Sequence, residues 1–354
     1  MKLGINLSTV RAHNEFVILD LIGRYHVSRR ELSELSNLTP ATVSSIISRL
    51  IEEGVVAEGH KVPSRGGSKG GRQRTNLQLV AGSRIAGGIL VDRSGVEGNV
   101  VDILGTIYAQ HSHRLTGPLD QLTEPNIIEL LVGMIRELGQ GLGPDTSFMG
   151  WGLGVPWWYP SSVNWDLIAN EVRQELHLPA LYLVQNAVSA ATGEWWYADE
   201  PLILPSLYLF MGGGIGGCFI RHGEHDAAPI FQPVEIGHMG IQPDGPVCYC
   251  GGRGCLEQLA GPTVALRHEN VTQAAQYLGY ALRSLTLLFD LHEIIVSGPQ
   301  SHLLEMHYLP VVRQVLGSNP PVRMTRVLPK GQAVGAAAVV FHKEGRLAEK
   351  EKTI

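Results

Sequence analysis

The sequence has few cysteines, a mild net charge and no long apolar run. Four cysteines among 354 residues are too few for a disulfide scaffold, and 42 glycines fall well short of the roughly one in three that collagen requires. A net charge of −5 with 44% apolar residues excludes a wholly disordered chain. No apolar run approaches the roughly 18 uncharged residues of a membrane helix, and Lys2, Asn6 and Arg11 interrupt any signal-peptide core. Without these features we expect a globular, cytoplasmic protein with no membrane partner. At roughly 100–200 residues per domain, the length allows two or three domains.

Charge is divided unevenly along the chain. Taken whole, the net charge of −5 argues weakly against nucleic-acid binding. Residues 1–80 nevertheless contain eleven Lys/Arg against seven Asp/Glu, a net charge of +4, whereas the other 274 residues carry seventeen against twenty-six, a net charge of −9. The change in charge comes just after residues 63–74, which are rich in Gly and Ser and carry four Lys/Arg and no acid. Taken by itself, this segment has the composition of a flexible linker. We therefore expect a basic module joined to an acidic body.

The first part of the basic module has the pattern of two helices joined by a turn. Residues 16–22 are mostly apolar and predict a first helix with a broad apolar face. Ser28 and Glu31, three residues apart, can form a capping box, in which both side chains accept hydrogen bonds from free N–H groups at the start of a helix. This pattern predicts a short second helix over 29–36 and a turn at 37–38.

A third helix is predicted to begin at Thr39 and Pro40 and to end at Gly54. Thr39 can cap the helix, and Pro40 suits the first position, where a missing N–H costs nothing. One side carries an apolar stripe with helical spacing: Val43, Ile46, Ile47, Leu50 and Ile51. The opposite side carries short polar or basic side chains: Thr42, Ser44, Ser45, Ser48 and Arg49. Such a face fits the major groove of DNA, where bulky groups would clash with bases and acidic groups would repel phosphates.

Two strands are predicted at 55–58 and 75–79, so that residues 63–74 become the loop of a two-stranded wing. The wing carries basic residues suited to the minor groove or to phosphates: Lys61, Arg65, Lys69, Arg72 and Arg74. Together these features predict a winged helix-turn-helix that binds DNA, the alternative being a small structural helical bundle with a solvated polar face. The predicted DNA contacts are Arg29, Thr39, Thr42, Ser44, Ser45, Arg49, Arg65, Lys69 and Arg72.

The acidic body contains a cluster of metal-ligand residues. One imidazole and three thiols fall within eighteen residues, and the intervening glycines allow tight turns around an ion: His238, Cys248, Cys250 and Cys255. Three sulfur ligands and one nitrogen in a four-coordinate site favour zinc, and the full set of protein ligands makes the site structural. Only Cys218 is left over, which argues against a disulfide framework. The alternative is a tight loop of reduced cysteines without metal.

The segment from Glu235 to Glu257 resembles the signature of the ROK family (repressors, open reading frames and kinases), and residues 1–80 resemble the DNA-binding module of its repressor branch. Further similar segments are Asn14–Ile22, Gly154–Pro156, Gly212–Gly216 and Gly331–Ala336. The resemblance implies an α/β fold, in which an N-terminal winged helix-turn-helix precedes a two-lobed actin-like (ribonuclease H-like) sugar-kinase fold with a sugar between the lobes. The implied domains are 1–80 for DNA binding, 81–188 with a C-terminal helix at about 331–354 for the first lobe, and 189–330 for the second lobe with the zinc site.

Kinase members of the family carry an aspartate that acts as general base for the attacking sugar hydroxyl. The matching position here is Asn186, within Gln185–Ala191, and an amide cannot accept the proton at neutral pH. Loss of a positioned base typically costs about 10²–10⁴-fold in rate. The nucleotide side also departs from the family, since Asp92–Val96 replaces Asp-x-Gly-Gly-Thr and Gly298-Pro299 replaces Gly-Gly. We therefore predict no catalytic residue and no useful kinase activity, with an active or bifunctional sugar kinase as the alternative.

At the family's sugar-contacting positions this sequence matches the family better than it does on the nucleotide side. The resemblance assigns ligand binding to Gln185, Asn186, Glu235, His238 and Glu257, and carboxylates are good acceptors for sugar hydroxyls. All six tryptophans fall between residues 151 and 196, either as core residues or as rings that stack on a sugar. Trp157 replaces the family's glycine after Val-Pro, so it either lines or fills the cleft. A filled cleft would make the protein a ligand-blind repressor.

The combined prediction is a sugar-responsive transcriptional regulator, most simply a repressor, whose partners are operator DNA and a sugar or sugar derivative. A homodimer, or a tetramer built from two dimers, would place paired helix-turn-helix modules on a palindromic operator. A ligand in the cleft would favour one arrangement of the lobes and shift the two modules. This coupling is reciprocal, so operator DNA must also change the affinity for the sugar.

Overall fold

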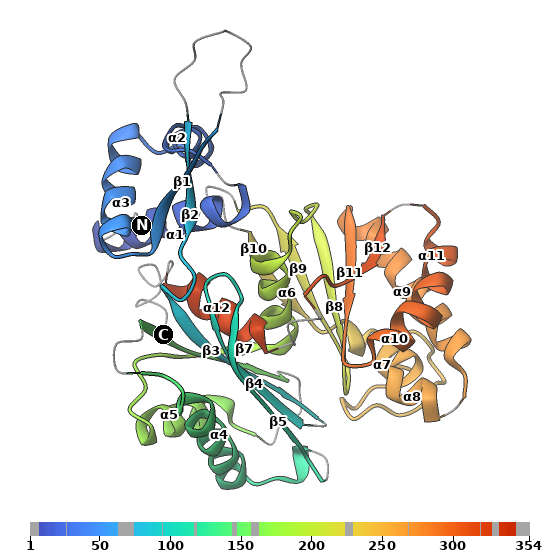
Figure 1. Ribbon diagram of the computed structural model, residues 1–354. Helices are drawn as coiled ribbons and strands as arrows, with labels where there is room; N and C mark the ends of the chain where they lie inside the picture. The colour runs from blue at the N-terminus through green and yellow to red at the C-terminus, as the bar shows by residue number, and fades with distance from the viewer. Residues whose placement is uncertain are drawn as a thin grey trace, which may run out of the picture.

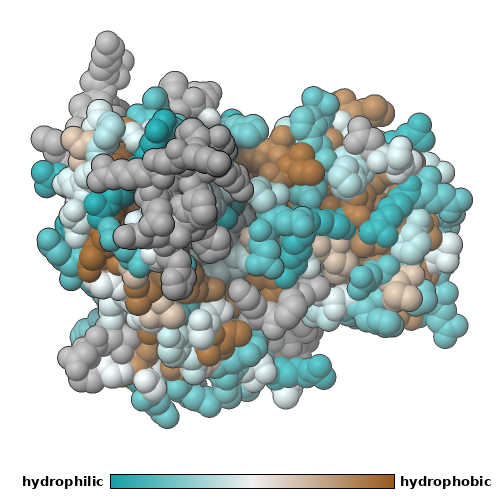
Figure 2. All heavy atoms as spheres, turned by 45° about the horizontal axis from the view of Figure 1, so that its top comes forward, coloured by the Kyte–Doolittle hydropathy of each residue, from teal (hydrophilic) through white to brown (hydrophobic). Residues whose placement is uncertain are grey.

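The computed structural model describes residues 7–25, 27–62, 74–93, 95–116, 119–143, 147–156, 163–223, 229–267, 269–318, 320–327 and 333–344. They form an N-terminal domain and two α/β lobes (Figure 1). The surface seen in Figure 2 is largely hydrophilic, with apolar residues in separate patches. None of the helices in the described ranges is long and apolar enough to span a membrane. Arg65, Lys69 and Arg72 of the predicted wing lie outside the described residues, as does Trp157.

The N-terminal domain is a winged helix-turn-helix, as predicted. It consists of α1 (Leu7–Tyr25), α2 (Arg29–Ser36), α3 (Pro40–Glu52) and the antiparallel strands β1 (Val56–Val62) and β2 (Arg74–Leu79). Both predicted caps are present, because Ser28 and Glu31 form the capping box of α2 and Oγ1 of Thr39 accepts a hydrogen bond from the N–H of Thr42. The apolar stripe of α3 packs into one core with the apolar face of α1.

The first lobe is built on a five-stranded sheet in the order β5-β4-β3-β6-β7. Its strands are β3 (Ile85–Asp92), β4 (Gly95–Asp102), β5 (Ile107–Arg114), β6 (Phe148–Val155) and β7 (Leu181–Gln185), and β6 and β7 run parallel to β3. A 3₁₀ turn η1 (Leu119–Gln121), α4 (Glu124–Gly139) and α5 (Trp165–Glu175) pack on one face. The other face carries the last helix, α12 (Val334–Glu344), which approaches so closely that a Cβ on Gly152 would lie 1.9 Å from the carbonyl oxygen of Ala336.

The second lobe repeats this plan with the sheet order β10-β9-β8-β11-β12. Its strands are β8 (Ser206–Met211), β9 (Ile215–Arg221), β10 (Ile230–Val234), β11 (Glu293–Ser297) and β12 (Val322–Met324). Its helices are η2 (Ile236–His238), α7 (Leu256–Ala260), α8 (Pro262–Arg267), α9 (Val271–Phe289), α10 (Ser301–Leu303), the π-helical η3 (Leu304–Tyr308) and α11 (Leu309–Leu316). Residues of α9 and α11 pack with one face of the sheet into a separate apolar core.

Helix α6 (Asn186–Tyr197) lies between the two lobes (Figure 1). It packs on the second sheet through Ala187 and Ala190, which share a core cluster with Tyr208 and Phe210 of β8. It also crosses α12 of the first lobe at two glycines, where a Cβ on Gly193 would lie 2.7 Å from the Cα of Gly335. This arrangement brings the ends of strands from both lobes together at the start of α6.

Candidate DNA-binding face, metal centre and interlobe cleft

The outer face of α3 carries the predicted DNA-contacting side chains. Thr39, Ser44 and Ser45 are exposed, and Thr42 is half-buried. Ser48 extends the same face, so most side chains on it are short and uncharged. The backbone of α3 can therefore come close to the base edges of a major groove.

The two predicted arginine contacts on described residues are held by acidic neighbours. Arg49 forms ion pairs with Glu15 of α1 and, at 2.9 Å, with Glu53. Arg29 lies 3.2 Å from a carboxylate oxygen of Glu58. Glu15 also pairs with Arg84, at the start of the first lobe. Arg49 therefore connects α3 to α1 and, through Glu15, to the body, a role that the helical pattern could not reveal because Glu15 is 34 residues away.

The ion pairs of Glu15 predict a pH dependence. Burial alone would raise the pKa of Glu15, but hydrogen bonds and charge from Arg49 and Arg84 outweigh it and lower the pKa below the ordinary 4.5. The stabilisation is therefore complete above about pH 4.5 and is lost as the pH falls through the lower pKa of the folded state. We expect Glu15→Gln to cost about 1 kcal/mol at pH 7 and to reduce the acid sensitivity of unfolding in urea. Equal acid sensitivity in the variant and the wild type would contradict this assignment.

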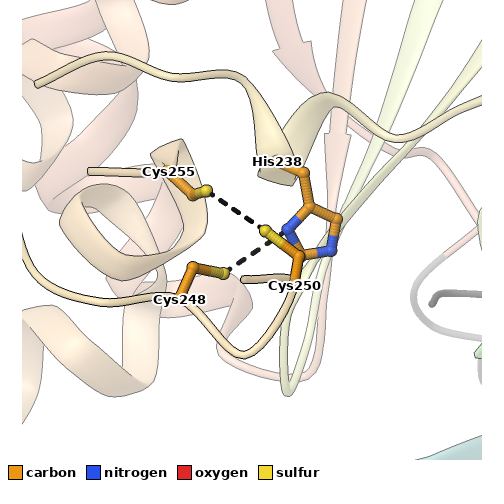
Figure 3. A group of neighbouring side chains, drawn as sticks. All are labelled: His238, Cys248, Cys250 and Cys255. Carbon is orange, nitrogen blue, oxygen red and sulfur yellow. Dashed lines mark hydrogen bonds between the residues drawn. The ribbon is translucent and has the colours of Figure 1, made fainter. Parts of the chain in front are cut away.

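The four predicted metal ligands converge on one point (Figure 3). Their ligand atoms all lie within 4.8 Å of one another: those of His238, Cys248, Cys250 and Cys255. Sγ of Cys248 is 3.6 Å from Nδ1 of His238, and Sγ of Cys250 is 3.6 Å from Sγ of Cys255. Tetrahedral zinc with bonds of about 2.0–2.3 Å requires ligand separations of this size. Without a cation, burial raises the pKa of the Cys255 thiol to about 12, and a bound metal ion would replace its proton.

The loop that carries the cysteines depends on glycine at two turns. Gly251 has φ +88° and Gly254 has φ +58°, a region that other residues rarely adopt. A Cβ on Gly254 would also lie 1.7 Å from the carbonyl oxygen of Gln242. These turns fold the chain back so that Cys255 reaches Cys250 and begins α7.

A cleft between the lobes gathers all five predicted ligand residues. Its lining includes Gln185, Asn186, Glu235, His238 and Glu257, together with the glycine-rich turn 213–216. Nε2 of Gln185 donates a hydrogen bond to Glu235 at 2.8 Å. Burial and the neighbouring Glu257 raise the pKa of Glu235. His238 therefore belongs both to the metal cluster and to the cleft, and Glu257 lies at the start of the helix that Cys255 begins.

The structure adds three cleft residues that the sequence patterns did not identify. Arg93 lies 4.2 Å above the ring of Tyr249 and 3.5 Å from the carboxylate of Glu257. The hydroxyl of Tyr249 donates to Glu257 at 2.6 Å. The carboxylate of Asp92 accepts a hydrogen bond from the N–H of Gly213 at 3.1 Å. Side chains of the first lobe thus occupy the approach to the glycine-rich turn, and the only sequence signal was the altered segment that begins at Asp92.

The departures on the nucleotide side predict that restoring a general base does not restore a kinase. Asn186→Asp returns the carboxylate, but Asp92–Val96 still differs from Asp-x-Gly-Gly-Thr and Gly298-Pro299 from Gly-Gly. We expect sugar-dependent ATP turnover to stay at background in the wild type and to rise less than about tenfold in Asn186→Asp, well below the 10²–10⁴-fold effect of a base in a competent site. A coupled ADP assay with glucose, xylose and N-acetylglucosamine measures this. Robust turnover in either protein would contradict the prediction.

The tryptophans serve packing in every case that the structure describes. Trp151 and Trp165 are buried in the core of the first lobe. Trp195 and Trp196 pack against α1 of the N-terminal domain rather than facing the cleft. The prediction that tryptophans stack on a sugar is therefore wrong for these four rings. Strand β6, helix α5 and the last turn of α6 direct them into apolar cores instead. Trp157 and Trp158 lie outside the described residues.

A winged helix-turn-helix in front of a two-lobed, sugar-kinase-like body with an intact His/Cys₃ cluster defines a class of DNA-binding regulator. Comparison with known proteins agrees, since residues 14–57 match the winged helix-turn-helix DNA-binding family and residues 160–270 match the ROK family. A segment similar to the winged helix-turn-helix family therefore precedes a segment similar to the ROK family.

The chain is similar to named repressors over most of its length. It is 27% identical over 268 residues to the xylose repressor of Bacillus spizizenii, covering 73% of this chain and 67% of that protein. It is 24% identical over 265 residues to the DNA-binding transcriptional dual regulator NagC of Escherichia coli, covering 72% of this chain and 64% of NagC. These relatives are named as regulators, which favours a regulator over an enzyme.

Solved structures agree on the fold. A ROK family transcriptional regulator, described as a homologue of the Escherichia coli MLC protein, superposes with a TM-score of 0.73 at 16% identity and covers 96% of this chain and 97% of its own. A ROK family glucokinase from Streptomyces griseus, in complex with glucose and AMPPNP, has a TM-score of 0.59 at 20% identity and covers 72% of this chain and 98% of its own. The predicted fold class is thus confirmed, and kinases share the fold of the body.

Proposed function

We propose that this protein is a transcriptional repressor whose binding to operator DNA responds to a sugar or sugar derivative in the interlobe cleft. One observation carries the proposal: the cleft keeps polar residues at the sugar-contacting positions, Glu235, His238 and Glu257, but has Asn186 where a kinase needs its base. A site that can bind a sugar without phosphorylating it, joined to a DNA-binding domain, has the properties of a sensor. The xylose and N-acetylglucosamine repressors among its relatives support a sugar as the ligand.

The same proposal assigns the remaining parts of the chain. His238 and the three cysteines hold a structural zinc ion, which fixes the loop that leads to Glu257. We assign domain boundaries near residues 80, 188 and 330, with α12 in the first lobe; the boundary near 188 falls in the first turn of α6. The protein acts in the cytoplasm as a homodimer or a tetramer, because paired helix-turn-helix modules read palindromic operators.

The DNA-binding part of the proposal predicts a large effect of Ser45→Glu. A carboxylate on the outer face of α3 would meet the phosphates and base acceptors of the major groove, and such like-charge contacts cost several kcal/mol. We expect affinity for a duplex selected from random DNA by the wild-type chain to fall at least about 100-fold. Ser284→Glu, on the exposed side of α9 in the second lobe, is the matched control and should bind normally. Equal binding by both variants would exclude α3 as the reading helix.

The sensing part is tested by titrating sugars into the same complex. D-xylose, N-acetylglucosamine, glucose and their phosphates are added to wild-type protein on the selected duplex, and Glu235→Gln serves as the cleft variant. We expect at least one sugar to change DNA affinity by about fivefold or more in the wild type and less in the variant. A sugar that binds the body but never alters DNA affinity would overturn the proposal.

A further inference from the structure

Helix α6 begins at the cleft between the lobes and ends against the DNA-binding domain. Its first residue, Asn186, lines the cleft, and its last turn carries Trp195 and Trp196, roughly 15 Å further along the helix axis. Most of the residues of α6 are buried. Packed protein interiors compress little, so a shift of the first turn of a buried helix such as α6 also shifts its last turn.

The last turn of α6 contacts α1 of the DNA-binding domain through aromatic rings. The ring of Phe16 on α1 lies 6.0 Å from that of Trp195 and 5.6 Å from that of Trp196, measured between centroids. The guanidinium of Arg24 lies 4.2 Å from the centroid of the Trp195 ring and donates a hydrogen bond to the backbone carbonyl of the same residue. Helix α1 therefore rests directly on the end of α6.

The last turn of α6 is also linked by hydrogen bonds to the segment that connects the DNA-binding domain to the first lobe. Nε1 of Trp196 donates to the carbonyl of Ile103 at 3.0 Å, and the hydroxyl of Tyr197 donates to the carbonyl of Asp102 at 3.3 Å. The buried carboxylate of Asp102 accepts a hydrogen bond at 2.9 Å from the N–H of Gly82, which lies between the two domains. The packing of α1 and the connecting segment thus meet at one turn of one helix.

Phe16 contacts both α6 and α12, and these two helices pack on different lobes. Glu194 ties α6 to the second lobe through Arg323 of β12, at 2.6 Å. The ring of His342 on α12, which packs on the first sheet, lies 5.3 Å from Phe16. The backbones of α6 and α12 are in close contact where Gly193 and Gly335 cross, so a change in the angle between the lobes would shift this crossing and with it the surface under α1. A cavity of about 390 Å³ beside α1, lined in part by Gly23 and Trp196, leaves room for α1 to follow.

We propose that α6 couples the cleft to the DNA-binding domain, with Trp195 and Trp196 as the residues that position α1. The inference rests on the proposed function and specifies how the two sites communicate. It requires that DNA binding alters the cleft end of α6 as well as the reverse, because coupling between two sites is reciprocal.

The first test uses DNA alone. Amide hydrogen exchange is measured in the full chain with and without saturating selected duplex, for wild type, Trp196→Leu and the control Trp165→Leu, whose ring is buried in the first lobe away from α6. We expect duplex to change exchange at Gly213–Ile215 and in the first turn of α6 by about fivefold or more in the wild type and the control, and not in Trp196→Leu. Trp196→Phe, which keeps a ring but loses the hydrogen bond to Ile103, replaces Trp196→Leu if that variant does not fold. An unchanged cleft in the wild type, or an equal change in the folded Trp196 variant, would overturn the inference.

The second test adds D-xylose or N-acetylglucosamine as the probe. The ratio of DNA affinities without and with the sugar should approach one in the Trp196 variant, while its affinity for the sugar alone stays within about threefold of the wild type. Loss of sugar affinity itself would instead place Trp196 in the binding site and count against a coupling role. If neither sugar acts on the wild type, the sugar response of the proposed function fails, and the exchange experiment still decides the role of α6.

Discussion

Cys250→Ser is expected to remove the metal ion and to lower the melting temperature of the protein by roughly 10 °C. Cys250 lies with its Sγ 3.6 Å from that of Cys255, and serine is a poor replacement for a thiolate in a sulfur-rich site. Gly251 and Gly254 form turns with positive φ beside this cluster, and glycine leaves them conformationally free, so we expect the loop to rely on its metal ligands to stay folded. A loss of several kcal/mol at about 2–4 °C per kcal/mol gives a shift of this size. Elemental analysis should find one zinc per chain in the wild type.

Cys218→Ala is the matched control for this experiment. Cys218 is buried on β9, outside the metal cluster, so the control should keep its zinc and lose far less stability. Incubating the wild type with a chelator should reproduce the effect of Cys250→Ser. A wild type that contains no zinc and melts identically with and without chelator would end the assignment of a metal site.

Arg323→Ala is expected to destabilise the protein by about 3–5 kcal/mol, the cost of leaving a buried charge unpaired. The guanidinium of Arg323 lies 2.6 Å from Glu194, which is fully buried, and 2.7 Å from Glu293, whose side chain is 5% exposed. Removing the arginine leaves two carboxylates in the interior. Urea unfolding followed by circular dichroism measures the change.

Arg326→Ala provides the comparison, because Arg326 pairs with Glu200, whose side chain is 71% exposed. Exposed ion pairs contribute about 0–1 kcal/mol, so this variant should unfold close to the wild type. If Arg323→Ala were no more destabilising than Arg326→Ala, the buried network would not stabilise the joint between α6 and the second lobe.

The parts of the fold and sites that could be predicted from the sequence depend on residues close together in the chain. The capping box of Ser28 and Glu31 needs residues three positions apart, and the apolar stripe of α3 needs helical spacing. The cysteine cluster lies within eighteen residues, with His238 at one end. These local patterns, together with the family resemblance, were sufficient for the winged helix-turn-helix, the grouping of one His and three Cys, and the fold class.

The contacts that could not be predicted join residues far apart in the sequence. Arg49 looked free for DNA until Glu15, 34 residues away, was placed beside it. The pairing of Arg93 with Glu257 depends on the approach of the two lobes, which no spacing encodes. The tryptophans gave no signal of direction, and the helix that carries Trp195 and Trp196 turns them toward Phe16.

The sequence by itself determined the local chemistry of this protein: a helix with a short polar outer face, a set of one His and three Cys that could hold a metal ion, and an amide at the position that matches a kinase base. Caps, turns and metal loops are decided by neighbouring residues, so they can be read without coordinates. Only the tertiary structure decided which of these parts touch, because long-range packing depends on the whole core at once. It brought the cleft, α6 and the DNA-binding domain into one continuous path from Asn186 to Phe16.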